Sequence, residues 1–278
     1  MRVHFLGVRG STPAPGAEFV RYGGHTSCLA LTLDGDTAPT LLLDAGTGIR
    51  RCTSLLDGGA FSGTILLSHL HWDHLHGLPF FGGADRDDAR VQVLVPDPLD
   101  GDDAVSLLAR GMSPPHFPVR PDELRGDWRF MLHEPGERAV EGFSVTTLEI
   151  PHKGGRTYGF RVNDGRSVLT YMPDHCPSAL GPGPDGWGEY HPAAMALASG
   201  ADVLVHDAQL IADEVEREAD FGHSAGEYAV ALARNADARS VVLFHHKPDR
   251  KDDELDEIAR RYAGQPVTTA AQSVVLDL

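Results

Sequence analysis

The 278-residue sequence contains little cysteine and no long apolar segment. Its three cysteines, Cys28, Cys52 and Cys176, are odd in number and form no close pairs, which excludes a disulfide framework. No apolar run is long enough to cross a bilayer, and the first residues resemble a strand instead of a signal peptide. These absences predict a cytoplasmic protein with no membrane partner.

Basic residues are also scarce, and no segment concentrates them. The chain has 24 Lys and Arg against 40 Asp and Glu, for a formal net charge of −16. Long nucleic acids are bound through many Lys and Arg contacts to phosphate. We therefore expect a small-molecule substrate and no long nucleic acid partner.

Hydrophobic residues make up 41% of the chain, enough for a full core, and no linker or low-complexity tract divides it. The sequence thus predicts one domain over residues 1–278. Clusters of strands followed by alternating helices, in both halves, predict an α/β protein and fit an αββα sandwich, in which two β-sheets are flanked by helices. The predicted strands are residues 2–6, 28–33, 40–44, 64–68, 91–95, 129–133, 144–150, 158–162, 167–171, 203–206, 240–244 and 274–278. The predicted helices are residues 48–56, 75–82, 102–110, 191–199, 225–235 and 252–262.

The most informative segment is His69-Leu-His71-Trp-Asp73-His74, directly after the apolar run at 64–68. Three imidazoles and a carboxylate this close would be unfavourable unless divalent cations shared their lone pairs. Successive side chains alternate in an extended segment, so His69, His71 and Asp73 point one way. The chain then begins to coil, and His74 points in a different direction. This spacing predicts two neighbouring metal ions, the first bound by His69 and His71 and the second by Asp73 and His74.

Three further candidate ligands each follow a predicted strand. His152 comes after residues 144–150, Asp174 after 167–171 and His245 after 240–244. Asp174 has two oxygens and could bridge both cations, whereas an imidazole offers one free lone pair. Paired divalent cations suit the hydrolysis of phosphate esters.

These motifs resemble those of metallo-β-lactamase-fold hydrolases, in the branch of ribonuclease Z and the phosphoribosyl cyclic phosphodiesterases. The matching segments, in chain order, are residues 7–13, 22–28, 43–48, 69–74, 152 with 158–160, 173–174, 205–207, 222–224 and 243–245. The resemblance implies one metal on His69, His71 and His152 and another on Asp73, His74 and His245. Asp174 and a hydroxide would bridge the two. It also implies two Zn²⁺, with Mn²⁺ as an alternative, and a possible homodimer.

The resemblance also suggests roles outside the ligand set and shows departures from the family pattern. Asp44 would bind no metal itself but would orient the side chains that do. His25 occupies a position where the family often has Asn. We interpret His175 and His246, which neighbour Asp174 and His245, as non-ligands. The interval between His152 and Asp174 is too short for the arm with which ribonuclease Z grips tRNA, which again argues against a long nucleic acid.

For catalysis, we expect His223 to protonate the leaving group, Asp207 to orient His223, and Asp73 to help position the nucleophile. The predicted function is hydrolysis of a small, cyclic phosphodiester, such as a cyclic nucleotide or a phosphoribosyl cyclic phosphate. Two alternatives stay open: a lactone or thioester hydrolase on the same dinuclear site, and a non-catalytic metal-binding accessory protein.

Two loops, residues 113–119 and 176–190, could set specificity. Phe117, Trp187 or Tyr190 could stack on a base or cover the site, or simply pack within their loops.

Overall fold

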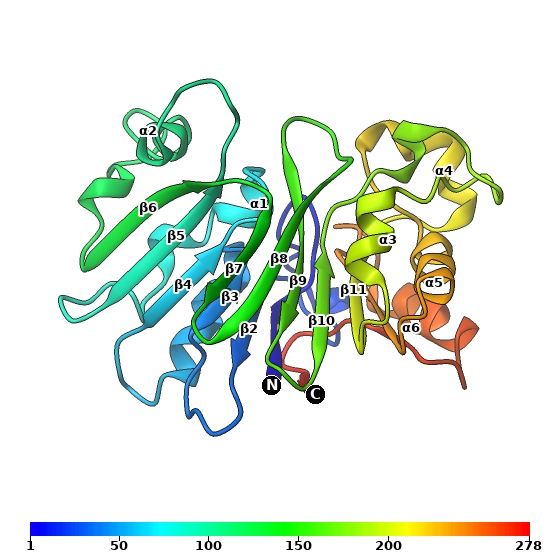
Figure 1. The fold of residues 1–278 in the computed structure, drawn as a ribbon, viewed down its shortest axis with the longest axis horizontal. Coiled ribbons are helices and arrows are strands. Elements are labelled where there is room, and N and C mark those ends of the chain that lie inside the picture. The colour runs from blue at the N-terminus through cyan, green and yellow to red at the C-terminus, as the bar shows by residue number, and fades with distance from the viewer.

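The computed structural model describes residues 1–278 and shows two seven-stranded sheets packed face to face, with helices outside them (Figure 1). The first sheet has the order β14-β1-β2-β3-β4-β5-β6. Its strands are β1 Arg2–Gly7, β2 Cys28–Thr32, β3 Leu41–Leu43, β4 Ser62–Leu66, β5 Arg90–Pro96, β6 Asp127–His133 and β14 Val275–Asp277. From β3 to β6 these strands are parallel, so their carboxyl ends meet at one edge.

The second sheet has the order β13-β12-β11-β10-β9-β8-β7. Its strands are β7 Gly136–Val140, β8 Phe143–Ile150, β9 Thr157–Asn163, β10 Val168–Met172, β11 Val203–Asp207, β12 Val241–Phe244 and β13 Val267–Thr269. Strands β10 to β13 are parallel, while β9 runs antiparallel to both β8 and β10. Therefore β8 ends at the same edge as β10, β11 and β12.

The helices are short and cover the outer faces of the sheets. The α-helices are α1 Trp72–Leu75, α2 Ala104–Ala109, α3 Pro192–Ala198, α4 Ala212–Glu218, α5 Gly226–Asn235 and α6 Asp252–Arg261. The 3₁₀ helices are Ala17–Phe19, Thr47–Leu55, Leu78–Phe80, Pro121–Glu123, Pro177–Leu180 and Ala219–Phe221. In Figure 1, α3, α5 and α6 lie on the outer side of the second sheet, and α2 lies beyond β5 and β6.

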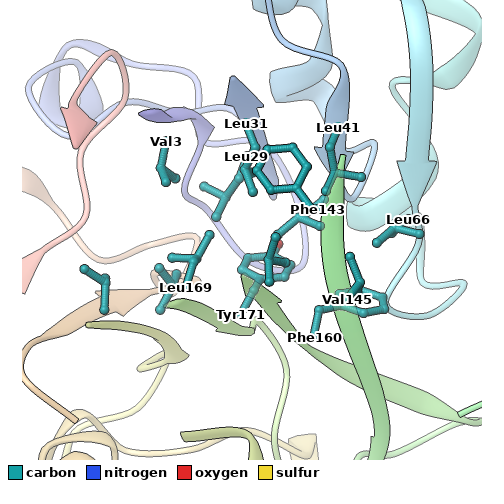
Figure 2. Packing of buried hydrophobic residues seen from close by; sticks show 14 of the residues in the cluster. Val3, Leu29, Leu31, Leu41, Leu66, Phe143, Val145, Phe160, Leu169 and Tyr171 are labelled. Carbon is teal, nitrogen blue, oxygen red and sulfur yellow. The ribbon is translucent and has the colours of Figure 1, made fainter. Parts of the chain in front are cut away.

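A central core fills the space between the sheets. Figure 2 shows side chains such as Leu29 and Leu41 of the first sheet facing Phe143, Phe160 and Tyr171 of the second. Because side chains alternate along a strand, the residues between them face outward. Those outward residues form two further cores under the helices, one on each side. This explains why inner strands such as β3 and β12 are apolar throughout, and it confirms the predicted αββα sandwich.

Some local predictions were wrong. The helix predicted at 48–56 is a 3₁₀ helix at Thr47–Leu55. The helix predicted at 75–82 is instead α1 at Trp72–Leu75 followed by a 3₁₀ helix at Leu78–Phe80, so Asp73 and His74 are already helical. Strands β7 and β13 and helix α4 were not predicted; β7 and α4 are rich in exposed polar residues that carry a weak apolar pattern.

The two ends of the chain lie close together (Figure 1). The Met1 amino group donates to the Leu278 carbonyl at 3.0 Å. None of the helices has both the length and the apolar character that crossing a membrane requires.

Candidate metal centre

The candidate ligands gather where strands of both sheets end. His69 follows β4, while His152, Asp174 and His245 follow β8, β10 and β12 of the second sheet. Since those strands end at one edge, their terminal side chains converge there, as is usual for the chemistry of α/β folds.

The first cluster consists of His69, His71, His152 and Asp174, whose potential ligand atoms lie within 4.8 Å of one another. The Nε2 atom of His152 lies 3.3 Å from Nδ1 of His71 and 3.5 Å from Oδ1 of Asp174. The Nε2 atom of His69 lies 3.9 Å from that same oxygen. Three imidazole nitrogens thus surround one carboxylate oxygen.

The second cluster consists of Asp73, His74 and His245, with Asp174 beside them. The Nε2 atoms of His74 and His245 are 3.2 Å apart. Each lies close to Oδ2 of Asp174, at 2.9 and 3.2 Å, and to Oδ2 of Asp73, at 3.1 and 3.0 Å. Asp174 therefore presents one oxygen to each cluster, which is the arrangement that a bridging carboxylate requires.

The chemistry of these clusters fits divalent cations. Burial lowers the pKa of His69, His71 and His152, so each is neutral and keeps a lone pair at neutral pH. The Nε2 atom of His69 is buried and makes no hydrogen bond. Burial disfavours charge on His74 as well, yet surrounding carboxylates raise its pKa well above the usual value. The site therefore favours positive charge, and bound cations would supply it.

Polar groups behind the clusters fix the orientation of the imidazoles. Asp44 Oδ2 lies 2.7 Å from Nδ1 of His74 and accepts hydrogen bonds from the hydroxyls of Ser68 and Tyr171 at 2.9 and 2.8 Å. His152 donates through Nδ1 to the carbonyl of Gly222 at 2.7 Å, which leaves its Nε2 free. Such partners raise the basicity of a ligand and hold its ring in place. The geometry matches the role expected of Asp44.

One glycine of the N-terminal motif is needed because of close packing. A Cβ atom at Gly10 would lie 2.4 Å from the ring of His245. The next residue, Ser11, donates its backbone N–H to Oδ2 of Asp73 at 2.7 Å. The segment at residues 7–13 therefore packs against the second cluster and orients Asp73.

His223 lies beside the clusters and is bonded to Asp207 as expected. Its Nδ1 donates to Oδ2 of Asp207 at 3.0 Å and lies 3.5 Å from Oδ1 of Asp174. Asp207 is fully buried and also accepts the backbone N–H groups of His175, Gln209 and Ser224. Burial lowers the pKa of His223, but the Asp207 carboxylate outweighs this effect and raises that pKa to about 9.

The ambiguous histidines lie outside both clusters. His25 contacts the hydroxyl of Thr47, His175 contacts His206, and Nε2 of His246 donates to the carbonyl of Ala270. This geometry agrees with the interpretation of His175 and His246 as non-ligands. The assignment of the seven cluster residues as ligands, and of Asp73, His223 and Asp207 as catalytic residues, stays a prediction.

A cavity of about 720 Å³ opens onto the clusters and is lined by His71, Asp73, His152, Asp174 and His223. The aromatic residues in its lining are Trp72 and Phe221, which are 68% and 64% exposed. The sequence did not predict a role for either residue, because a pattern of apolar positions does not distinguish an exposed aromatic side chain from a buried one. Nor did the sequence predict a role for Ser11, Gln209 or Lys247, which line the cavity.

The aromatic residues proposed from the two loops do not line this cavity. Trp187 and Tyr190 pack against the core under the helices of the second sheet, and Phe117 lies edge-on to Phe80. Ordinary loop packing is therefore the correct interpretation of these three residues.

Comparison with known proteins gives the family of this chain. Residues 40–246 match the model of the beta-lactamase superfamily domain. Ribonuclease Z of Halorubrum lacusprofundi is 27% identical, with 88% of this chain and 86% of the relative covered. Ribonuclease BN of Salmonella gallinarum is 28% identical, with 88% of each chain covered.

Solved structures share the fold over the whole chain. The metallo-β-lactamase fold protein YhfI of Bacillus subtilis has a TM-score of 0.69 at 18% identity, with 99% of both chains covered. The short form of human tRNase Z has a TM-score of 0.66 at 21% identity, with 100% of this chain and 99% of that chain covered. Zn²⁺-bound PqqB of Methylobacterium extorquens has a TM-score of 0.67 at 18% identity, with 100% of both chains covered.

The comparisons overturn one expectation, that the chain takes no long nucleic acid. Relatives that match it over nearly their full length are named as ribonucleases. The argument from a net charge of −16 failed because a total says nothing of the local charge at a site, where bound cations would add several positive charges. The lack of an arm between His152 and Asp174 does not restore the exclusion.

The match covers most of the chain, and both the fold and the ligand geometry agree with it. The chain therefore belongs to the beta-lactamase superfamily and has the metallo-β-lactamase fold.

Proposed function

We propose that this protein is a phosphodiesterase that uses two divalent cations, Zn²⁺ or alternatively Mn²⁺. His69, His71 and His152 would hold one cation, while Asp73, His74 and His245 would hold the other, with Asp174 between them. The observation that carries the proposal is the position of the Asp174 carboxylate, which turns one oxygen toward each cluster. When bound, the cations supply a water of low pKa as the nucleophile and polarise the phosphoryl oxygens.

The residues around the clusters supply the remaining chemistry. The bond between water oxygen and phosphorus forms as the bond between phosphorus and the leaving oxygen breaks. The leaving oxygen then takes a proton from Nε2 of His223, because Nδ1 is engaged with Asp207. Asp73, which is held by the Ser11 N–H, positions the nucleophile.

The first candidate substrate is a small, cyclic phosphodiester, for which a cavity of about 720 Å³ has room, within the ~300–1,000 Å³ usual for small-molecule sites. The names of the relatives favour a second candidate, a phosphodiester bond of RNA. Both use the same cations and the same acid, so they differ only in what surrounds the phosphate.

Hydrolysis by the metal-loaded protein tests this function directly. The panel consists of bis(p-nitrophenyl) phosphate, cyclic nucleotides, a transfer RNA with a 3′ extension, a p-nitrophenyl carboxylic ester and a lactone. We expect about two divalent ions per chain and turnover of phosphodiesters in preference to the ester and the lactone. Faster turnover of the ester or lactone would favour a carbonyl hydrolase. No turnover at full metal loading would favour an accessory protein.

The pKa of His223 predicts an alkaline limit to activity. A pKa of about 9 keeps the imidazole protonated at neutral pH. The rate on substrates with a poor leaving group should therefore fall as the pH rises through about 9. In Asp207→Asn the charge that raises this pKa is lost, so the limit should move to lower pH. Profiles of kcat/KM against pH measure both effects.

Asp202→Asn serves as the control, because Asp202 precedes the same strand β11 at its opposite end. Its profile should match that of the wild-type protein. An alkaline limit that stays in place in Asp207→Asn would mean that another group sets it.

A further inference from the structure

A second cavity of about 670 Å³ adjoins the first at Trp72 and has no assigned role. The two cavities share Leu70, His71 and Trp72, so both reach the candidate ligands. A phosphodiester at the clusters would therefore extend into one cavity or both. The segments that line the second cavity are the turn after β4, the end of β5, α2 and the loop between β8 and β9.

Trp72 offers an open aromatic face at the boundary between the cavities. Its indole stacks on His76, with ring centroids 5.1 Å apart and planes 21° from parallel. It is nevertheless 68% exposed, so much of the ring remains accessible. The Nε1 atom lies 4.0 Å from the position of a Cβ on Gly111, so the edge of the ring lies beside Gly111 in the lining. An indole that is held in place and left open in this way is suited to stacking a planar ring.

The charge of the second cavity differs from that of the rest of the protein. Its lining has no Asp or Glu, although the chain has 40 such residues. It includes His116, and also Arg110 and Arg156, which form ion pairs with Asp100, Asp102 and Glu149 outside the lining. The first cavity is lined by Glu218 and Asp249 in addition to the acidic residues of the clusters. Leu75, Leu107 and Leu108 give the second cavity an apolar wall. The lining thus suits an uncharged planar group with polar edges that is attached to an anion.

We propose that the second cavity binds a nucleobase stacked on Trp72, so that the substrate is a nucleoside phosphodiester and not a cyclic sugar phosphate without a base. The inference rests on the proposed function, because the phosphate of that substrate would lie at the clusters. It applies to a cyclic nucleotide and to the end of an RNA chain alike. Trp72 is then a residue that determines specificity.

The first test measures adenosine binding to the metal-loaded protein by calorimetry and by tryptophan fluorescence. We expect adenosine to bind and to quench emission. Stacking of one base typically changes affinity roughly 5- to 150-fold, so Trp72→Ala should weaken binding by that factor. Trp72→Phe should keep most of the affinity and lose the quenching. Phe80→Ala, which removes an exposed aromatic ring outside both cavities, should bind as the wild-type protein does.

The second test compares the KM of a 2′,3′-cyclic nucleotide with that of a ribose cyclic phosphate. The wild-type protein should prefer the nucleotide, and Trp72→Ala should lose that preference. Adenosine that binds equally well to Trp72→Ala, or fails to bind the wild-type protein, would overturn the inference. If phosphodiesters are cleaved while adenosine does not bind, the inference alone fails. If adenosine binds through Trp72 while no phosphodiester is cleaved, the proposed function alone fails.

Discussion

Replacing Asp174 with alanine should reduce the metal content from about two ions per chain to below one and lower kcat/KM on phosphodiesters by at least ~10³-fold. The physical reason is that Asp174 alone faces both clusters, with Oδ1 near His152 and Oδ2 near His74 and His245. Its loss weakens both cation sites at once. Cations contribute several kcal/mol to the stabilisation of charge in such transition states, and each ~1.4 kcal/mol is worth a factor of ten in rate.

The measurements are elemental analysis after removal of free metal and steady-state kinetics with excess Zn²⁺ or Mn²⁺. Asp185→Ala is the matched control, since Asp185 is an exposed acid in the loop that follows Asp174. It should keep both the ions and the rate. If Asp174→Ala retained two ions and near wild-type turnover, the carboxylate would have no bridging role and the dinuclear centre would have to be abandoned.

Replacing His223 with alanine should lower kcat by roughly 10²–10⁴-fold on substrates with an alkyl leaving group while the metal content is unchanged. His223 is bonded to Asp207, lines the cavity at the clusters and is held in its protonated form at neutral pH. These are the properties of a general acid. A p-nitrophenolate group departs without a proton, so the loss on bis(p-nitrophenyl) phosphate should be much smaller.

The dependence on the leaving group separates a proton donor from a metal ligand. Loss of bound metal in His223→Ala would show that His223 is a ligand, which its 3.5 Å distance from Asp174 makes a concrete alternative. An equal loss of rate on both kinds of substrate would also argue against a general acid. His191→Ala is the control, because His191 is a partly exposed histidine at the start of α3, outside the cavity.

Much of the site could be predicted because each ligand stands next to a recognisable strand. The apolar runs before His69, Asp174 and His245 identify strand ends without any knowledge of their neighbours. Within residues 69–74 the spacing also predicted which side chains group together, and the structure places His69 with His71 and Asp73 with His74. The αββα sandwich followed from the order of strands and helices.

Other features depended on long-range contacts that no local pattern contains. The backbone of Asp44 and His245 has positive φ, 61° and 58°, at the turns that end β3 and β12. Such conformations are unfavourable for these residues and persist only when the surrounding structure holds them. The sequence also did not predict that Trp72 and Phe221 are exposed, because an aromatic side chain usually indicates a core position.

The sequence by itself determined most of the strands and the side chains that follow their ends, because alternation and apolar runs are local properties of the chain. The tertiary structure decided which of these side chains meet. His71 and His152 are 81 positions apart and His74 and His245 are 171 apart, and each pair comes within about hydrogen-bonding distance only because the sheets pack face to face. The division of Asp174 between the clusters, the acidic first cavity and the acid-free second one arise from the same packing.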